Sequence, residues 1–348
     1  MDSDKVIFLY AEVTPYLLGC VKSFNKQFPN ITLRIYYTKI FPNIKIETPS
    51  IEFVDKKTFK SKFDLLNDIK NNYPRILLIS GRMESDYLFV SSKFRSKLTR
   101  VCLYDTIYTR SFFQILKKIF SYFLYKRYFD IMWGVGTLQE KFALDIGYNR
   151  TNIRKGFYVA DEIFFNKSFT PNFDKNFVNF LYVGRLVKEK NVLMLAKVLD
   201  KINSLSKSNH KLGIVGDGVY KNKIQEFDCV EYYGLKTQEE IITIAKNYHA
   251  FCLPSIYEPW GVVLHEMAAI GLPIIASNKC GSSYDILKEG FNGFKFNPVN
   301  SKSLENSLNS FIEISLDEKI NMSHNSKKMA KLISHSNWNK TLASFINS

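Results

Sequence analysis

Two glutamates, Glu258 and Glu266, flank the sequence Pro-Trp-Gly-Val-Val-Leu-His and are the first residues suited to chemistry. Pro259 favours the first turn of a helix, where its missing N–H costs nothing, and Gly261 lets the backbone approach a ligand closely. The unpaired N–H groups of residues 260–263 would form an anion site suited to a diphosphate. Glu266 lies two turns further on and can point back toward a sugar hydroxyl. The alternative is a surface-loop glutamate followed by an ordinary amphipathic helix.

A second group of residues follows the apolar run 179–183. Gly184 would stand at the carboxyl end of this strand, with two cations, Arg185 and Lys190, close behind it. A guanidinium offers a planar fork for phosphate oxygens, and a lysine offers a point charge. The group predicts contacts to a pyrophosphate, and the alternative is a solvated basic loop.

Short apolar runs alternate with helical patterns along the whole chain, and these elements must position both groups. Strands are expected at residues 6–10, 32–37, 75–80, 100–103, 130–135, 179–183, 210–215, 231–233, 250–254, 273–277 and 294–296. Helices are expected at residues 18–27, 192–201, 238–247, 262–270 and 301–314, in a stretch through Glu140, and in the tail to Ser348. This alternation indicates parallel α/β sheets, whose ligands bind at the carboxyl ends of the strands. A polar stretch with Pro171 predicts a domain boundary at residues 165–178.

In this order and spacing, the motifs resemble the GT-B glycosyltransferases of family 4, which carry a Glu-x7-Glu motif. The matching residues, over roughly 178–300, are Gly184-Arg185-Leu186, Lys190, Gly216-Asp217-Gly218, Glu258 with Glu266, 268–277, Gly281 with Asp285, and 292–294. The resemblance implies an α/β fold of two doubly wound Rossmann-like domains that face each other across a cleft. It implies an acceptor-binding domain at residues 1–165, a nucleotide-sugar-binding domain at 178–325, and a C-terminal helix at 326–348 that crosses back to the first domain.

The resemblance also implies a role for each matching residue. Arg185 and Lys190 would neutralise the diphosphate leaving group, Glu258 would bind hydroxyls of the donor sugar, and Glu266 would bind the ribose. The implied donor-binding residues are Gly19, Gly184, Gly216, Asp217, Leu235, Trp260, Gly261, Val262, Val263 and Glu266. The sugar would be transferred with retention and without a metal or other cofactor. The one Asp-x-Asp sequence, Asp2-Ser-Asp4, is interpreted as inert.

The N-terminal half departs from the family pattern in two places. Where the family has two glycines after the first strand, this chain has only Gly19, and Tyr104-Asp105 stands where many members have His-Asp. Asp105 is a fourth candidate catalytic residue, and the alternative is a residue that caps the end of a strand. Residues 156–161 resemble the segment before the interdomain linker, and residues 336–338 resemble the terminal helix.

The net charge of +15 is concentrated in part around residues 93–128, which hold nine Lys or Arg and one acidic residue. Residues 110–128 mix cations with Phe, Tyr, Leu and Ile at helical spacing, which predicts a helix lying on an anionic membrane. The alternative is a helix that packs on the sheet and leaves its cations in water. No nucleic-acid-binding motif accompanies the charge.

Other features of the sequence bear on location. No run of eighteen apolar residues and no signal-peptide pattern occurs. The five cysteines form no CxxC pair, as expected of reduced thiols in a cytosolic protein. The expected location is therefore the cytoplasm, with the protein peripheral on the inner face of the cytoplasmic membrane.

The prediction is a retaining, hexosyltransferase-type glycosyltransferase. The donor would be a nucleotide sugar, with UDP rather than GDP as the nucleotide, and the acceptor would be a lipid-linked saccharide. The reaction would serve the biosynthesis of a surface polysaccharide (O-antigen, lipopolysaccharide or capsule). One alternative is a GT-B sugar-nucleotide epimerase, a class that lacks the combined Gly-Arg-Leu and Glu-x7-Glu motifs. The other is a catalytically silent sugar-nucleotide-binding scaffold at the membrane, which the four intact residues Arg185, Lys190, Glu258 and Glu266 disfavour.

Overall fold

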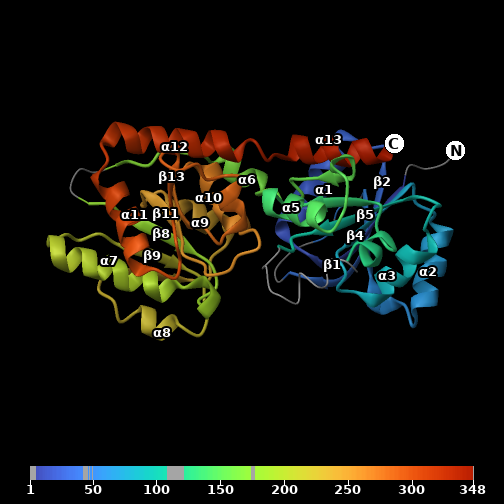
Figure 1. The fold of residues 1–348 in the computed structure, drawn as a ribbon, viewed down its shortest axis with the longest axis horizontal. Helices are drawn as coiled ribbons and strands as arrows, with labels where there is room; N and C mark the ends of the chain where they lie inside the picture. The colour runs from blue at the N-terminus through green and yellow to red at the C-terminus, as the bar shows by residue number, and fades with distance from the viewer. Residues whose placement is uncertain are drawn as a thin grey trace. The chain divides into compact units, whose positions relative to one another are not determined.

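The computed structural model describes residues 5–41, 46, 48, 50–107, 121–173 and 177–347. The Asp2-Ser-Asp4 sequence and much of the basic segment at residues 108–120 lie outside this range. The chain divides into two compact units: Met1–Val159 together with Ile333–Ser348 form unit 1, and Ala160–Leu332 form unit 2. Each unit has a parallel sheet at its centre with helices packed around it (Figure 1).

The sheet of unit 1 has the strand order β3-β2-β1-β4-β5-β6-β7 among the described residues, and every neighbouring pair is parallel. The strands are β1 (Lys5–Val13), β2 (Thr32–Ile40), β3 (Ile51–Asp55), β4 (Ile76–Ser80), β5 (Thr99–Tyr104), β6 (Ile131–Gly134) and β7 (Ile153–Arg154). The helices are α1 (Pro15–Gln27), α2 (Lys62–Asn71), α3 (Ser85–Lys93), α5 (Thr137–Asp145) and α13 (His335–Ile346), and residues 121–126 are also helical.

Both faces of this sheet are buried, so its central strands are apolar without alternation. Ile7 and Leu9 face a core that contains Leu65 of α2 and Val90 of α3. Phe8 lies between them in sequence, and its side chain therefore points to the opposite face. There its ring stacks on Trp338 of α13, with ring centroids 6.5 Å apart.

Helix α13 belongs to unit 1 although α12 (Leu316–Ala330), which precedes it, belongs to unit 2. Trp338 is 1% exposed, and its indole N–H donates a hydrogen bond of 3.0 Å to the carbonyl of Phe157. The Asn339 amide donates to the Ser23 hydroxyl of α1 at 3.2 Å. The last described helix is therefore part of the core of the unit that contains the first strand (Figure 1).

The sheet of unit 2 has the order β10-β9-β8-β11-β12-β13 among the described residues, again with every neighbouring pair parallel. The strands are β8 (Phe180–Val183), β9 (Leu212–Val215), β10 (Val230–Gly234), β11 (Ala250–Leu253), β12 (Ile274–Ser277) and β13 (Gly293–Phe296). The helices besides α12 are α6 (Glu162–Asn166), α7 (Val192–Ser206), α8 (Lys221–Ile224), α9 (Gln238–Ala245), α10 (Val262–Ile270) and α11 (Ser301–Glu313).

The boundary between the units lies between Val159 and Ala160, earlier than the 165–178 stretch expected from composition. The polar residues after Ala160 are anchored to α10 despite their composition. The Ala160 N–H donates to Nδ1 of His265 at 3.1 Å, and the Phe169 N–H donates to the carbonyl of Ile270 at 2.8 Å. Unit 2 likewise extends to Leu332 rather than ending at residue 325, because α12 packs on α10.

All five cysteines lie in the described part of the chain, where they are buried and form no disulfide. No helix within the described ranges is long and apolar enough to cross a membrane.

Candidate active site

The motif residues of unit 2 lie where the strand order of its sheet reverses. Strands β8 and β11 are neighbours in the sheet although β9 and β10 lie between them in sequence. Gly184 directly follows β8, and the loop that holds Glu258 follows β11. In doubly wound sheets a ligand binds at this reversal point, at the carboxyl ends of the strands.

An ion pair between Lys190 and Glu258 joins the two loops. The Lys190 ammonium donates to the Glu258 carboxylate, and the two side chains are only 15% and 13% exposed. A backbone hydrogen bond of 2.8 Å from the Ile256 N–H to the Glu189 carbonyl runs beside this pair. The structure therefore brings the two sequence motifs into one site.

A third loop holds Glu258 from the other side. Its N–H donates to the Lys279 carbonyl at 3.2 Å, and its own carbonyl accepts from the Gly281 N–H at 2.9 Å. Residue 281 must be glycine here, since a Cβ would lie 2.0 Å from the Pro259 carbonyl oxygen. The Glu258 backbone is thus fixed on both sides, which preorganises its carboxylate.

Helix α10 begins with free N–H groups, as the sequence predicts. Gly261 is its N-cap residue, with φ of 85°, a left-handed conformation that favours glycine. Within the part of the chain that the structure describes, the N–H groups of residues 260–263 have no hydrogen-bond partner. These donors and the positive end of the helix dipole are suited to phosphate oxygens.

The side chain of Trp260 does not take part in this anion site. It is 2% exposed, and its indole nitrogen is buried without a hydrogen-bond partner in the described structure. The Trp260 carbonyl accepts from the Ser282 N–H at 2.9 Å, which fixes the loop. Trp260 can therefore contact a donor only through its backbone N–H.

Glu266, on α10, carries a carboxylate that has no hydrogen bond or ion pair among the described residues. Burial, and to a smaller extent the negative charge of Asp161, the N-cap residue of α6, raises the pKa of Glu266 to about 8. Such a carboxylate lacks the donors that would stabilise its charge. The two hydroxyls of a ribose could supply them.

This raised pKa leads to a test of stability. The pKa of Glu266 is higher in the folded state than in the unfolded state, so the protonated side chain favours the folded protein. This stabilisation is complete below about pH 4.5 and is lost as the pH rises toward about 8. Glutamine mimics the protonated form. Glu266→Gln is therefore expected to stabilise the ligand-free protein by on the order of 2 kcal/mol at pH 8.5 and hardly at all at pH 4.5.

Urea denaturation at the two pH values measures this difference. Glu313→Gln, at the exposed end of α11, is the matched control and should show no such gain. A Glu266→Gln variant with equal effects at both pH values would contradict the assigned cause. The same variant should bind a nucleotide more weakly, since glutamine accepts fewer hydrogen bonds than a carboxylate.

His265 was not singled out from the sequence although it lies inside the main motif. It is fully buried, and its Nδ1 accepts from the Ala160 N–H. Its Nε2 therefore carries the proton and donates to the Ala330 carbonyl at 2.9 Å. This neutral imidazole joins the first residue of unit 2 to α10 and α12, and so orients the helix that presents Glu266. Its position directly before Glu266 was the available signal.

The other predicted donor residues of unit 2 lie around the same strand ends. A Cβ on Gly216 would lie 1.9 Å from the Gly184 carbonyl oxygen, so the turns after β9 and β8 are in close contact. Arg185 is exposed, and its guanidinium has no partner among the described residues. Asp217 accepts from the Gly218 N–H at 2.8 Å, which fixes its turn. Leu235 follows β10 and is 76% exposed.

Gly19 does not lie in a phosphate-facing loop. It lies within α1, which starts earlier than expected. Thr14 is the N-cap residue and accepts from the Leu17 N–H at 3.5 Å, and Pro15 occupies the first turn. Because the backbone N–H of Gly19 belongs to the interior of the helix, it is not available to a phosphate.

Asp105 follows β5 in unit 1 and is surrounded by aromatic side chains. The Tyr158 hydroxyl donates to its carboxylate at 3.4 Å, and the Gln139 amide donates to its carbonyl at 2.7 Å. Burial raises the pKa of Tyr158 well above its ordinary value, so the hydroxyl keeps its proton. The ring of Tyr16 packs against that of Tyr158 at 4.6 Å. Asp105 is thus a positioned carboxylate at the carboxyl edge of its own sheet.

Comparison with known proteins bears on both the fold and the chemistry. Residues 164–329 match the family described as glycosyl transferases group 1. This range contains every predicted site residue of unit 2. Residues 164–329 form a glycosyltransferase domain.

Solved structures resemble the chain over both units. The apo form of the lipopolysaccharide outer core galactosyltransferase WaaB is 19% identical, with a TM-score of 0.72 over 98% of this chain and 99% of that one. Anabaena HepE, in complex with UDP and glucose, is 16% identical, with a TM-score of 0.75 over 99% of both chains. The chain has the GT-B fold. The predicted fold class of two Rossmann-like α/β domains is confirmed.

Curated relatives are similar over shorter stretches. A 41.2 kDa protein encoded in the cps region of Klebsiella pneumoniae is 26% identical over 225 residues, which are 60% of this chain and 62% of that protein. The chain matches less than two thirds of the length of the curated relatives at the top of the comparison.

Proposed function

We propose that the protein transfers a sugar from a nucleotide-sugar donor to a saccharide acceptor with retention at the anomeric carbon. The observation that carries this proposal is the Lys190–Glu258 pair beside the free N–H groups at the start of α10. A cation, an oriented carboxylate and an anion-binding helix end are what a diphosphate-linked sugar requires.

In this proposal the donor diphosphate lies on the N–H groups of residues 260–263. Arg185 and Lys190 neutralise the charge that develops as the bond to the sugar breaks, and fixed positive groups stabilise such charge without reorganisation. Glu258 binds the hydroxyls of the donor sugar, and Glu266 binds the ribose. Asp105 is a candidate for the acceptor side. Neither a metal nor another cofactor is needed for these steps.

The proposed donor nucleotide is UDP rather than GDP, and the structural neighbour HepE was solved with UDP and glucose. The proposed acceptor is lipid-linked and reached from an anionic membrane surface on the cytoplasmic side, with surface polysaccharide as the product. The neighbour WaaB is named for lipopolysaccharide synthesis, and the Klebsiella relative is encoded in a cps region. These similarities support the proposed acceptor and product.

A thermal-shift screen against UDP, GDP, CMP and their common sugar conjugates tests the donor. A ligand that binds only the folded state raises the melting temperature by mass action. We expect UDP or a UDP-sugar to raise it most, and the Glu266→Gln variant to show a smaller rise. A rise in melting temperature with GDP alone would overturn the proposal that UDP is the donor nucleotide. No rise with any nucleotide would favour a scaffold. Binding of a UDP-sugar without its hydrolysis or transfer would also favour the scaffold.

A further inference from the structure

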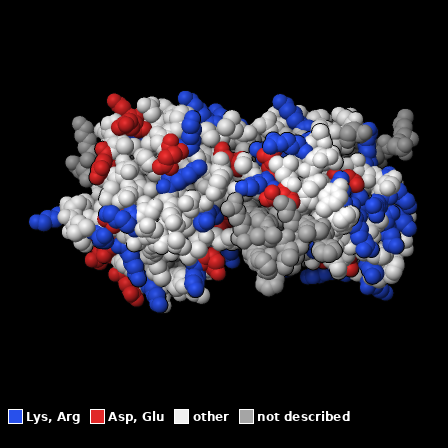
Figure 2. Space-filling model, viewed as in Figure 1, with Lys and Arg blue, Asp and Glu red and all other residues white. Residues whose placement is uncertain are grey.

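The excess positive charge of the chain lies almost entirely in unit 1. That unit holds 27 of the 48 Lys and Arg residues but only 14 of the 33 Asp and Glu residues, and so carries +13 of the net +15. In Figure 2 the Lys and Arg side chains gather over the part of unit 1 around α2 and α3, whereas the two signs are interspersed over unit 2. A one-signed surface of this kind attracts anionic partners.

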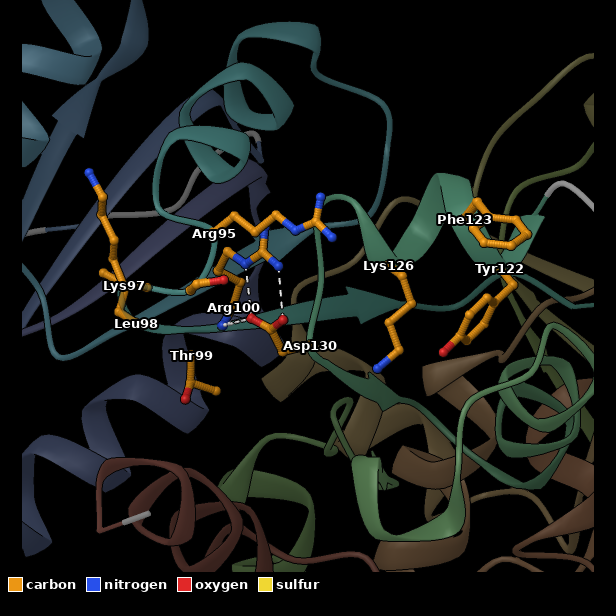
Figure 3. A pocket seen from close by; sticks show the side chains of 10 residues that line it. Arg95, Lys97, Leu98, Thr99, Arg100, Tyr122, Phe123, Lys126 and Asp130 are labelled. Carbon is orange, nitrogen blue, oxygen red and sulfur yellow. Dashed lines mark hydrogen bonds and ion pairs between the residues drawn. The ribbon is translucent and has the colours of Figure 1, made fainter.

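Unit 1 also contains a pocket of about 700 Å³ at the opposite edge of its sheet from Asp105, where β5 begins (Figure 3). It is formed by the turn between α3 and β5, by the helical residues 121–126, and by the residue before β6. The lining residues are Arg95, Ser96, Lys97, Leu98, Thr99, Arg100, Tyr122, Phe123, Lys126 and Asp130. Four of these are cations and one is an acid.

The acid is already neutralised. The guanidinium of Arg100, 1% exposed, donates two hydrogen bonds to the Asp130 carboxylate, from Nε at 2.9 Å and from the second terminal nitrogen at 2.8 Å. Its remaining terminal nitrogen donates to the Arg127 carbonyl at 2.8 Å. This bidentate ion pair forms part of the wall of the pocket (Figure 3). The other three cations form no ion pair among the described residues, so they are available to a ligand.

Of these cations, Lys126 is held in place by aromatic rings. Its ammonium lies 4.9 Å from the ring centroid of Tyr148 and 5.9 Å from that of Tyr122. In Figure 3, its end and the Tyr122 hydroxyl extend into the same open space beside Asp130, while Lys97 points outward. Arg95 lies above the Arg100 side chain in this view. Arg95 and Lys126 are therefore the cations best placed for an anion.

One largely exposed apolar side chain, that of Phe123, lines the pocket, and a second exposed apolar residue follows it in sequence. Phe123 is 72% exposed and Leu124 is 44% exposed, two residues and one residue before Tyr125 in the helical residues 121–126. A soluble anion would gain nothing from these side chains. A phospholipid would use both features, because its phosphate requires cations and its acyl chains accept an aromatic ring at the membrane interface.

We propose that this pocket binds the phosphate of an anionic phospholipid headgroup, with Phe123 entering the acyl region, and that it docks unit 1 on the membrane. This inference rests on the proposed function at a membrane surface and adds the site that makes the contact. It locates the contact in described residues outside the donor site.

Flotation with vesicles of phosphatidylcholine alone and of phosphatidylcholine with phosphatidylglycerol tests the pocket. The wild-type protein should float with the second vesicles only. Arg95→Gln combined with Lys126→Gln should lower partitioning by about tenfold, since each cation at an anionic surface contributes several-fold. Lys22→Gln combined with Lys26→Gln, on exposed positions of α1, removes the same charge and should lower partitioning by no more than about twofold. Phe123→Ser, which alters an exposed side chain and no charge, should also lower it.

Equal losses of vesicle binding in the two double variants would show that binding depends on net charge alone, and would overturn the proposed role of the pocket. If Phe123→Ser partitions onto vesicles like the wild type, and inorganic phosphate raises the melting temperature, the pocket is a site for soluble anions. This result would overturn the proposal of a lipid ligand. The nucleotide thermal shift is measured on the same samples. If the nucleotide still binds but the vesicles do not, only the docking inference fails, whereas loss of nucleotide binding in the wild type would count against the proposed function.

Discussion

Glu258→Gln is expected to lower donor turnover by at least about 100-fold, in line with the loss of one preorganised group at a reacting centre. Glutamine keeps the shape of the side chain but loses the charge that pairs with Lys190 and the capacity to accept from several sugar hydroxyls. The backbone bonds on either side of residue 258 remain, so the fold should be retained.

Hydrolysis of the donor identified in the thermal-shift screen provides the measurement and needs no acceptor. Glu226→Gln, an exposed residue just after α8, is the matched control and should turn over like the wild type. Unchanged turnover in Glu258→Gln, with nucleotide binding intact, would contradict the assigned role.

The Lys190–Glu258 pair contributes both to stability and to catalysis, and a double variant separates these two contributions. Lys190→Met alone leaves the mostly buried Glu258 carboxylate without its partner, which should lower the melting temperature. The combination of Lys190→Met with Glu258→Gln removes both charges and should restore much of the stability. Turnover should stay low in Lys190→Met, in Glu258→Gln and in the double variant. Lys190→Met removes the cation that neutralises the leaving group, Glu258→Gln removes the carboxylate that binds the sugar, and the double variant removes both.

Trp338→Ala is expected to destabilise unit 1 by about 4 kcal/mol, the range for a large aromatic removed from a core. The indole is 1% exposed and lies 5.2 Å from the Trp133 ring and 6.2 Å from the Phe24 ring by centroid. Its removal leaves a cavity and an unpaired Phe157 carbonyl. Both losses fall on the contact between α13 and the rest of the unit.

Urea denaturation followed by tryptophan fluorescence and circular dichroism measures this loss. Leu205→Ala, on a 72% exposed residue of α7 in unit 2, should change stability by less than about 0.5 kcal/mol. Trp338→Phe should fall between, because it keeps a ring but loses the indole donor. A loss of under about 1 kcal/mol in Trp338→Ala would mean that unit 1 is stable without α13.

The buried strands and the main helices of unit 2 are predictable because their signals are local. Runs such as Phe180–Val183 and Ala250–Leu253 are wholly apolar, as both faces of a parallel sheet demand. In unit 1, strands β3 and β7 and helices α2 and α3 were not among the predicted elements. Strand β3 pairs on one side only, so its core-facing pattern is weak. Helix α2 is capped by Ser61 and has an apolar stripe, so its signal was present and overlooked.

The site was predictable in its parts but not in its connections. The spacing of Glu258 and Glu266 and the glycines after the strands could be read directly. The pairing of Lys190 with Glu258 could not, because it depends on β8 and β11 becoming neighbours in the sheet. Gly19 was misplaced for a different reason. Its loop position followed from the family resemblance alone, whereas Thr14 and Pro15 form a local helix-start signal that the prediction did not use.

The discontinuous make-up of unit 1 has a consequence for the order of events during synthesis. Domains usually fold as the ribosome releases them, with the N-terminal one first. Here unit 2 is one continuous segment, whereas unit 1 needs Ile333–Ser348 to complete the face of the sheet that holds Phe8. The second unit can therefore reach its native state while the first still exposes an apolar sheet face. That face can bind a chaperone until α13 emerges from the ribosome.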